Sequence, residues 1–413
     1  MTPEPIAPRP AWTAGDVFAA LKNQELDKAE EIAVYLVSRE PYNIGGHVAF
    51  SETLNSKLRH EEAALAAKRA LALDPFNLSA GSNLACALIG LGYYREAKEI
   101  LDRILAARPG VYNAHWLRSL ANLGLLNFTE GFADYEYRFM HGSYPRRCPP
   151  HTYWRGDKTD VLFIYGEQGL GDQIQFCRFI DRARERCQGK VVMEVAPPLA
   201  VLMENMADQV WAGISDLAIP VAYTAHIPMI SLPFILGIDQ IDGSPYLGVQ
   251  PQPVDLQGAK VGLCWKGNPD YSRDLFRSLT LDDVRTLQGA APFACVQPAD
   301  ELPFDMPQLS GCDLGATAFA IDALDLVVTV DTVIAHLAGA MGKECWLIAP
   351  RYGEWRWGTE GTRTPWYDSI EVFRAPGGDR AKQLETVRAR LIERYPPGTW
   401  TEPTTSTRTN GKA

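Results

Sequence analysis

The segment 165–173 reads Tyr-Gly-Glu-Gln-Gly-Leu-Gly-Asp-Gln and places one carboxylate, Asp172, at the end of a glycine-rich turn. The apolar run 161–165 predicts a buried strand before the turn, and the apolar spacing after it predicts a helix. The glycines would let the backbone take positive φ or approach a bound group closely. A carboxylate near a helix N-terminus is favoured in its ionised form and can accept the proton of a hydroxyl group. We therefore expect Asp172 to act as a general base or, in the structural alternative, only to cap the helix.

The spacing of these glycines differs from two common nucleotide-binding patterns. It is neither the G-x-G-x-x-G of dinucleotide-binding proteins nor the G-x-x-x-x-G-K-[ST] of P-loop proteins. A nicotinamide-dependent enzyme and a P-loop kinase are therefore both disfavoured.

A second strand-to-helix junction lies at Asp331 and Thr332, which follow the apolar run 326–330. A ligand at such a junction meets free backbone N–H groups, a hydroxyl and the positive end of a helix dipole, which together suit a diphosphate. In the structural alternative, Asp331 and Thr332 only cap the helix and His336 is a core residue.

Cations for a charged leaving group are available in the loop that follows the predicted strand 261–265. Lys266, Arg273 and Arg277 lie there, and Gln297 ends the predicted strand 293–297 as a candidate for contacting a base or ribose. Lys266 could add affinity for phosphate or be a solvated lysine.

Two aromatic groups, Trp355-Arg356-Trp357 and Pro365-Trp366-Tyr367, occur near the C-terminal end. Aromatic rings stack on sugars and bases, but they also close domain cores. We favour packing for both groups, with Arg356 still able to face the site.

Residues 1–140 carry an internal repeat. Pro41, Pro75 and Pro109 are 34 positions apart, and twelve residues before each proline stands an alanine (Ala29, Ala63 and Ala97). A period of 34 is that of tetratricopeptide repeats, which are helix pairs. We expect three to four repeats, the last running from Tyr112 to about Met140. Such arrays bind extended peptide, so a protein partner is favoured over a spacer or dimerisation element.

The remainder alternates strand and helix patterns, which is typical of parallel α/β domains. The predicted strands are 161–165, 191–195, 227–230, 261–265, 293–297, 326–330 and 345–348. We expect a linker over 141–158, two Rossmann-like domains over 159–250 and 258–398, and a disordered tail over 403–413.

Three motifs in this order carry a resemblance to a known family. Residues 166–172, then 261–268 with Arg277-Ser278-Leu279, then 330–340 resemble the bacterial heptosyltransferase-like glycosyltransferases (GT-B, family 9-like). The subgroup that it resembles carries tetratricopeptide repeats ahead of the catalytic region. The resemblance implies an all-α solenoid followed by a compact GT-B pair of Rossmann-like α/β domains.

The resemblance also implies roles for individual residues. Asp172 takes the place of the general base, and Arg277 falls where related enzymes have a lysine that contacts the donor phosphates. With the donor on the second α/β domain, the glycine-rich turn becomes the acceptor-side loop, with Glu167, Gln168, Gly169 and Gly171. The donor-binding candidates are Lys266, Asn268, Arg273, Arg277, Gln297, Asp331, Thr332, Val333, Ile334 and His336.

The function implied is inverting, metal-independent transfer of a sugar from a nucleotide-sugar to a hydroxyl of a protein held by the repeats. Flagellin or another surface protein is the acceptor that the resemblance suggests. One alternative is an enzyme that acts on a lipid-linked or polysaccharide glycan. Another is a repeat scaffold whose glycosyltransferase region binds without turnover.

Composition narrows the partners and the compartment. A formal net charge of −10 makes nucleic acid a poor partner. The eight cysteines form no C-x-x-C pair and predict reduced thiols. The N-terminal residues show no signal pattern and no apolar run is long enough to span a membrane, so we expect a cytoplasmic protein. The histidines and acidic pairs lack the spacing of metal ligands, so no metal or other cofactor is expected. A homo-oligomer is possible on the sequence.

Overall fold

The computed structural model describes residues 12–140, 147–213, 222–309, 313–350 and 353–401. The contacts divide them into two compact units. One unit holds the described residues up to Leu126 together with Met140, and the other holds Asn127–Phe139 and the described residues from Arg147 onward. The sequence placed the boundary at residue 140, whereas the contacts group residues 127–139 with the α/β region. The predicted tail 403–413 lies outside the described residues.

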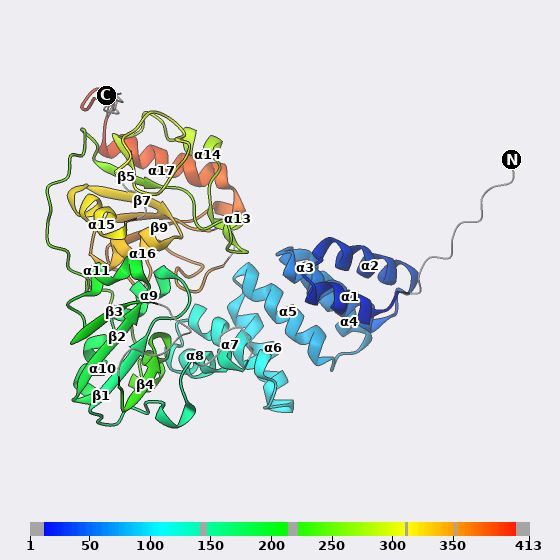
Figure 1. The fold of residues 1–413 in the computed structure, drawn as a ribbon. Coiled ribbons are helices and arrows are strands. Elements are labelled where there is room, and N and C mark those ends of the chain that lie inside the picture. Colours follow the sequence, from blue (N-terminus) through cyan, green and yellow to red (C-terminus); the bar gives the residue numbers. More distant parts are fainter. Residues whose placement is uncertain (1–11, 141–146, 214–221, 310–312, 351–352, 402–413) are drawn as a thin grey trace, which may run out of the picture. The chain divides into compact units, whose positions relative to one another are not determined.

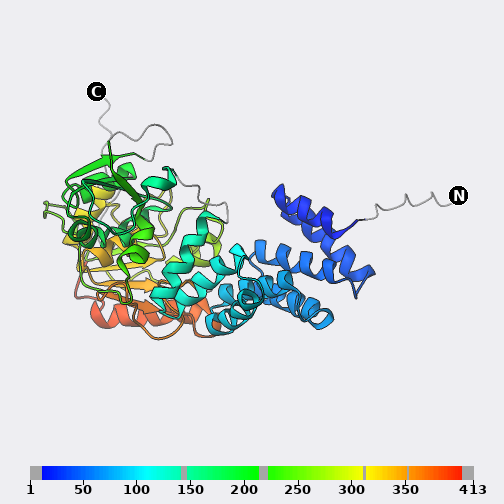
Figure 2. The ribbon, with the colours of Figure 1, turned by 90° about the horizontal axis from the view of Figure 1, so that it is seen from below.

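The described part of the first unit contains three helix pairs followed by one further helix (Figures 1 and 2). Each proline of the 34-residue repeat lies in a loop between two pairs, and Ala29, Ala63 and Ala97 are wholly buried in the second helix of a pair. The repeat fold predicted from the sequence is therefore confirmed. The helices are α1 (Ala14–Lys22), α2 (Leu26–Arg39), α3 (Ile44–Ser56), α4 (His60–Leu73), α5 (Leu78–Leu91), α6 (Tyr94–Ala107) and α7 (Tyr112–Gly124).

The tight turns of the repeat share a left-handed residue. Gln24, Leu58, Gly92 and Leu126 all have φ between 60° and 83°, and they are spaced by 34 positions. Only Gly92 is a glycine. In the other three turns a residue with a side chain takes the left-handed backbone conformation, which costs conformational free energy.

The second unit begins with α8 (Phe128–Tyr135) and the 3₁₀ turn η1 (Glu136–Phe139). The first of its two sheets is wholly parallel, with the order β3-β2-β1-β4. Its elements are η2 (Pro150–Thr152), β1 (Val161–Tyr165), α9 (Leu170–Cys177), α10 (Ile180–Cys187), β2 (Lys190–Val195), η3 (Pro197–Leu199), α11 (Ala200–Met203), β3 (Gln209–Ala212), β4 (Ala225–Pro228), η4 (Met229–Ser231) and α12 (Leu232–Leu236).

Part of the predicted linker is packed against this sheet. The backbone N–H of Trp154 donates to the carbonyl of His226 in β4 at 2.8 Å, and the Trp154 side chain is buried. Residues 141–146 of that linker lie outside the described residues.

The second sheet is also parallel, with the order β6-β5-β7-β8-β9. Helix α17 covers it with Leu384, Val387 and Leu391 (Figure 2). Its elements are β5 (Val261–Cys264), α13 (Asp274–Arg277), α14 (Leu281–Arg285), β6 (Phe293–Cys295), α15 (Leu314–Ala323), β7 (Leu326–Val330), α16 (Val333–Ala340), β8 (Cys345–Ile348), β9 (Ile370–Phe373), η5 (Pro376–Gly378) and α17 (Arg380–Arg394).

The fold class is thus an all-α repeat followed by two parallel α/β sheets, as the sequence predicted. Three strands were predicted with their observed bounds, β1, β7 and β8. The strand expected over 227–230 instead ends at Pro228, where η4 begins, and β3 and β9 were not predicted. β3 is a half-exposed edge strand without the apolar run of a buried one.

Candidate functional site

Both candidate loops lie at points where the strand order of a sheet reverses. In the first sheet, β2 and β4 flank β1 on opposite sides, and the glycine-rich turn follows β1. In the second sheet, β6 and β7 flank β5, and residues 266–273 and 331–332 follow β5 and β7. In open parallel sheets, ligands bind at the carboxyl ends of strands at such points. The topology therefore places both loops where a ligand site is expected.

Helices α9 and α16 bring the two loops together, because they pack directly on one another between the sheets (Figure 1). A Cβ placed on Gly171 of α9 would lie 2.6 Å from Cδ2 of His336 of α16. The His336 Nδ1 lies 2.9 Å from the Tyr367 hydroxyl, and the ring lies 5.1 Å from the Trp357 ring. Glycine at 171 is therefore needed for the close approach of the helices.

Asp172 is the third residue of α9, and both of its carboxylate oxygens have partners. Oδ2 accepts a hydrogen bond from the backbone N–H of Gly169 at 2.9 Å, which completes the N-terminal turn of the helix. Oδ1 is ion-paired with Nη2 of Arg356. The capping role raised as the alternative is therefore present, and it occupies one oxygen of the carboxylate.

Arg356 reaches α9 from the second half of the α/β unit. Its Nε donates to Gln175 Oε1 at 2.7 Å, and its Nη1 is paired with Glu354 Oε1 at 2.5 Å. The guanidinium carbon lies 4.2 Å from the centre of the Trp355 ring. The adjoining aromatic side chains are buried, as predicted: Trp355, Trp357, Trp366 and Tyr367.

Burial perturbs three titratable groups around this contact. It raises the pKa of Glu354, with Arg356 acting in the opposite direction, and it raises the pKa of Asp331, with Arg277 acting in the opposite direction. Burial also lowers the pKa of His336 well below its ordinary value, and the positive charge of Arg356 adds to that shift. His336 is therefore neutral at pH 7 and presents an uncharged ring to α9.

The acceptor-side loop is held mainly by the segment 127–139. Glu167 Oε1 pairs with Nη2 of Arg138 at 2.6 Å, and Arg138 is fully buried. Burial raises the pKa of Glu167, against the effect of Arg138. The Gln168 side-chain amide lies 3.3 Å from the Tyr135 hydroxyl. These contacts give Glu167 and Gln168 a role in fixing the loop.

The expected positive φ at the loop glycines was wrong, because the left-handed residue of the turn is Gln168 with φ 62°. The close approaches that Gly166 and Gly169 allow in the structure are to side chains of the same loop and helix. A Cβ on Gly166 would lie 2.5 Å from Gln173 Oε1, and one on Gly169 would lie 3.1 Å from Asp172 Oδ2.

On the donor side, Thr332 is the N-cap of α16, and its Oγ1 accepts from the Ile334 N–H at 3.2 Å. Ile334 is buried, and Val333 is partly exposed at the first position of the helix. Arg277 donates from Nη1 to the Asp331 carbonyl at 2.8 Å and from Nε to Asp274 at 2.9 Å. Arg277 and the first turn of α16 therefore belong to one cluster.

The remaining donor candidates lie in or against the loop after β5. The Gln297 Oε1 accepts from the backbone N–H groups of Trp265 at 2.6 Å and Lys266 at 3.0 Å, so its amide oxygen holds the loop. The side chains of Lys266 and Asn268 are exposed, and Arg273 is partly exposed. Asn268 Oδ1 accepts from the Asp270 N–H at 3.0 Å.

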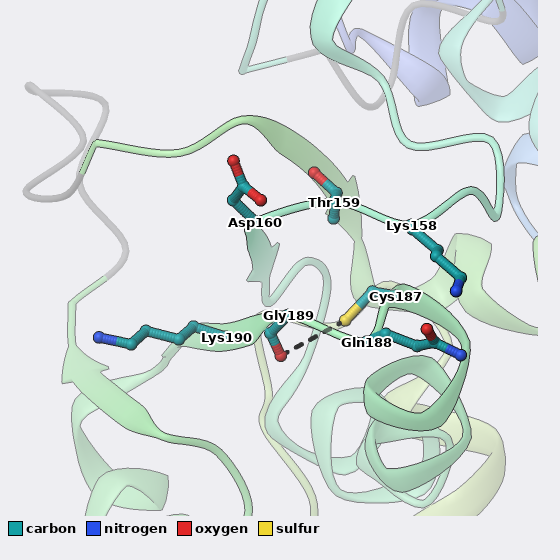
Figure 3. Close-up of a pocket in the computed structure, with 7 residues that line it drawn as sticks. All are labelled: Lys158, Thr159, Asp160, Cys187, Gln188, Gly189 and Lys190. Atoms are coloured by element: carbon teal, nitrogen blue, oxygen red, sulfur yellow. Dashed lines mark hydrogen bonds between the residues drawn. The ribbon is translucent and has the colours of Figure 1, made fainter.

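Figure 3 shows a pocket at the end of the first sheet that lies opposite the glycine-rich turn. Its lining includes Asp160 and Lys190, which lie at the amino ends of β1 and β2. Because Asp172 follows the carboxyl end of β1, this hollow is separate from the candidate site.

Four contributors were not among the site residues predicted from the sequence: Tyr135, Arg138, Gln175 and Glu354. For Arg356, the sequence left the direction of the side chain open. The only signals were an arginine between two tryptophans and the aromatic-rich stretch 128–139. Neither pattern identifies a partner.

Among the described residues, no group of three or more His, Cys, Asp or Glu side chains is placed to hold a metal ion. No described helix has the length and apolarity to cross a membrane. The seven cysteines within the described ranges are free thiols, and Cys312 lies outside those ranges.

Comparison with known proteins gives distant relatives. No protein-family model matches the chain. Protein FlbA of Caulobacter vibrioides is 26% identical over 309 residues, which are 62% of this chain and 51% of FlbA. The chain thus spans about half the length of this curated relative.

Two solved structures illustrate the structural likeness. A mutant O-GlcNAc transferase of Thermobaculum terrenum aligns over 92% of this chain and 91% of its own, with 14% identity and a TM-score of 0.36. A thermophilic tetratricopeptide protein of Thermus thermophilus aligns over 31% of this chain and 72% of its own, with 20% identity and a TM-score of 0.28.

Proposed function

We propose that this protein is an inverting glycosyltransferase that moves a sugar from a nucleotide-sugar donor to a hydroxyl group of a protein. The observation that supports it most is the packing of α9 on α16 through Gly171 and His336. We take this packing to set Asp172 near Asp331 and Arg277, in the loops that follow the carboxyl ends of β7 and β5. In the proposal, the diphosphate of the donor binds at those loops.

The reaction proposed is a single displacement. The acceptor oxygen forms a bond to the anomeric carbon while the bond from that carbon to the donor diphosphate breaks. The bonding electrons leave with the nucleoside diphosphate, and Asp172 takes the hydroxyl proton. Arg277, the Val333 N–H group and the dipole of α16 are the groups that we assign to the leaving charge. Since these groups can offset that charge, the proposed mechanism uses no metal ion. We also propose that the reaction takes place in the cytoplasm.

A protein acceptor is proposed because the repeats carry exposed aromatic side chains in register. Tyr42 and Phe76 follow Pro41 and Pro75, and their exposed fractions are 84% and 88%. Exposed aromatic residues on a repeat array suit protein recognition. Flagellin or another surface protein, suggested by the resemblance to heptosyltransferase-like enzymes, is the acceptor class to try first.

The first test is donor binding and consumption by the purified protein. A thermal-shift panel of nucleotide-sugars identifies the donor, since a ligand at 100 times its dissociation constant adds roughly 2.7 kcal/mol of stability. Release of nucleoside diphosphate is then compared between wild type and Asp172→Asn. Loss of a general base costs about 10²- to 10⁴-fold in rate, so the variant should bind donor and turn over at most about 1% as fast.

Asp181→Asn is the matched control, because Asp181 is an exposed aspartate of the same unit that pairs with Arg184. It should behave as wild type. If wild type binds a donor but releases no diphosphate even when candidate acceptor proteins and glycans are added, the non-catalytic scaffold becomes the correct description. If transfer occurs to a lipid-linked or polysaccharide glycan and to no protein, the glycan-acceptor alternative replaces the protein acceptor.

A further inference from the structure

Arg356 joins the two sides of the candidate site through one guanidinium group. It contacts Asp172 and Gln175 of α9, and it contacts Glu354 within its own half of the unit. Its plane lies against Trp355. Only 15% of the Arg356 side chain is exposed, so these contacts are made with little competing water.

The ion pair occupies the atom that the proposed reaction needs. Oδ2 of Asp172 is engaged by the Gly169 N–H, and Oδ1 is engaged by Arg356. Each oxygen of the carboxylate therefore already has one partner, so an acceptor hydroxyl must share an oxygen with the Gly169 N–H or with Arg356 until one of these contacts opens. The Gly169 contact is part of the first turn of α9, whereas the Arg356 contact joins two side chains.

The surroundings also make Arg356 a suitable anion ligand. It is near the partly buried carboxyl groups of Glu354 and Asp331, and Arg277 is the second guanidinium of the cluster. Arg277 is already committed to Asp274 and to the Asp331 carbonyl. A diphosphate entering between α9 and the loop after β7 therefore needs a further cation, and a guanidinium can bind two oxygen ligands at once.

We propose that Arg356 is an anion-binding residue of the donor site and that it exchanges partners. It pairs with Asp172 in the free protein and moves its Nη2 group to the donor diphosphate when the donor binds. Glu354 and Trp355 hold the rest of the side chain during the exchange. Asp172 is thereby freed for the acceptor hydroxyl only when donor is present, so the donor binds before the acceptor reacts. This inference rests on the proposed function.

A double-mutant cycle on nucleotide binding tests the exchange. The probes are UDP, GDP, dTDP and ADP, each with its nucleoside as a control that lacks the phosphates, and binding is measured by calorimetry. Arg356→Gln should weaken binding of the recognised diphosphate by about tenfold to hundredfold, the range of one charge-assisted hydrogen bond. Asp172→Asn should tighten it severalfold, because Arg356 no longer has to leave a carboxylate.

The double variant separates partner exchange from simple charge repulsion. If Asp172 acts only through Arg356, adding Asp172→Asn to Arg356→Gln should leave the affinity within about twofold of Arg356→Gln alone. If Asp172 simply repels the diphosphate, the gain from Asp172→Asn persists in the double variant, and the exchange is refuted. Arg356→Lys keeps the charge but not the fork, and it should fall between wild type and Arg356→Gln.

Arg390→Gln is the matched control, since Arg390 also pairs with a carboxylate, Glu371, and lies 5.1 Å from the Trp346 ring. It should bind diphosphate as wild type does. Equal affinity of wild type and Arg356→Gln for a diphosphate that does bind overturns this inference and leaves the proposed function standing. Absence of binding of every nucleotide and nucleotide-sugar to wild type overturns both.

Discussion

Replacing Gly171 with alanine should separate the two helices that bring the candidate site together. The new Cβ would lie 2.6 Å from Cδ2 of His336, so α9 and α16 must move apart by roughly 1 Å to reach ordinary contact. The His336 ring cannot easily turn aside, because it is buried, hydrogen-bonded to Tyr367 and packed on Trp357. Overpacking of this kind costs about 1–3 kcal/mol.

The sign of this effect is informative because helix propensity acts in the opposite direction. Gly171 lies within α9, where glycine to alanine alone should stabilise by about 0.5–1 kcal/mol. We therefore expect a net loss of about 0–2.5 kcal/mol in urea denaturation, together with reduced turnover from displacement of Asp172. Gly248→Ala, where the added Cβ meets nothing within 4 Å, should change little.

A double-mutant cycle identifies the clash as the cause. His336→Ala alone should be destabilising through the cavity that it leaves, but in the Gly171→Ala background its additional cost should be smaller by at least about 1 kcal/mol. A Gly171→Ala protein that is more stable than wild type, or additive effects of the two substitutions, would refute the packing argument.

Three further predictions concern the supports of the site and of the repeats. His336 has a lowered pKa in the folded state, so unfolding takes up a proton below about pH 6.5, and at pH 5.5 the free energy of unfolding should be about 1.4 kcal/mol lower than at pH 8. This loss should be absent from the pH profile of His336→Gln, and the same pH profile for both proteins would show that the ring is not held neutral. Arg138→Met removes the cation that pairs with Glu136 and Glu167, so it should lower the free energy of unfolding by about 3–5 kcal/mol in thermal or urea unfolding. Glu167→Gln should lower it by less, and equal losses would contradict the ion-pair reasoning. Gly92→Ala places a residue with a Cβ at a backbone φ of 83°, so it should destabilise the repeats by about 1 kcal/mol. Gly110→Ala, whose added Cβ would meet nothing within 4 Å, should be nearly neutral. Equal melting temperatures of the two variants would count against strain in the turn.

The sequence predicted the features that depend on local pattern. The 34-residue spacing of the prolines fixed the helix pairs, and uninterrupted apolar runs located the buried strands such as β1 and β7. The strand-to-helix junctions at Asp172 and Thr332 were also visible, because a buried run followed by small and polar residues marks the end of a parallel strand.

The contacts that define the candidate site were not predictable in this way. Arg356 and Asp172 are 184 positions apart, and their pairing depends on how the two sheets are joined through α9 and α16. Arg138 is 29 positions from Glu167, and nothing in the repeat pattern indicates that residues 127–139 pack with the α/β unit. The left-handed residue of the glycine-rich turn was misplaced because Gln168 takes a conformation that glycine normally takes.

In the proposed function, Asp172 takes the proton of a protein hydroxyl during sugar transfer. The most direct measurement is the intact mass of candidate acceptor proteins, flagellin first, co-expressed with wild type, with Asp172→Asn or with Asp181→Asn. The proposed function predicts an added sugar mass with wild type and Asp181→Asn, and its near-complete loss with Asp172→Asn while that variant still binds donor. Equal glycosylation by wild type and Asp172→Asn, or no added sugar with any of the three proteins, would contradict it.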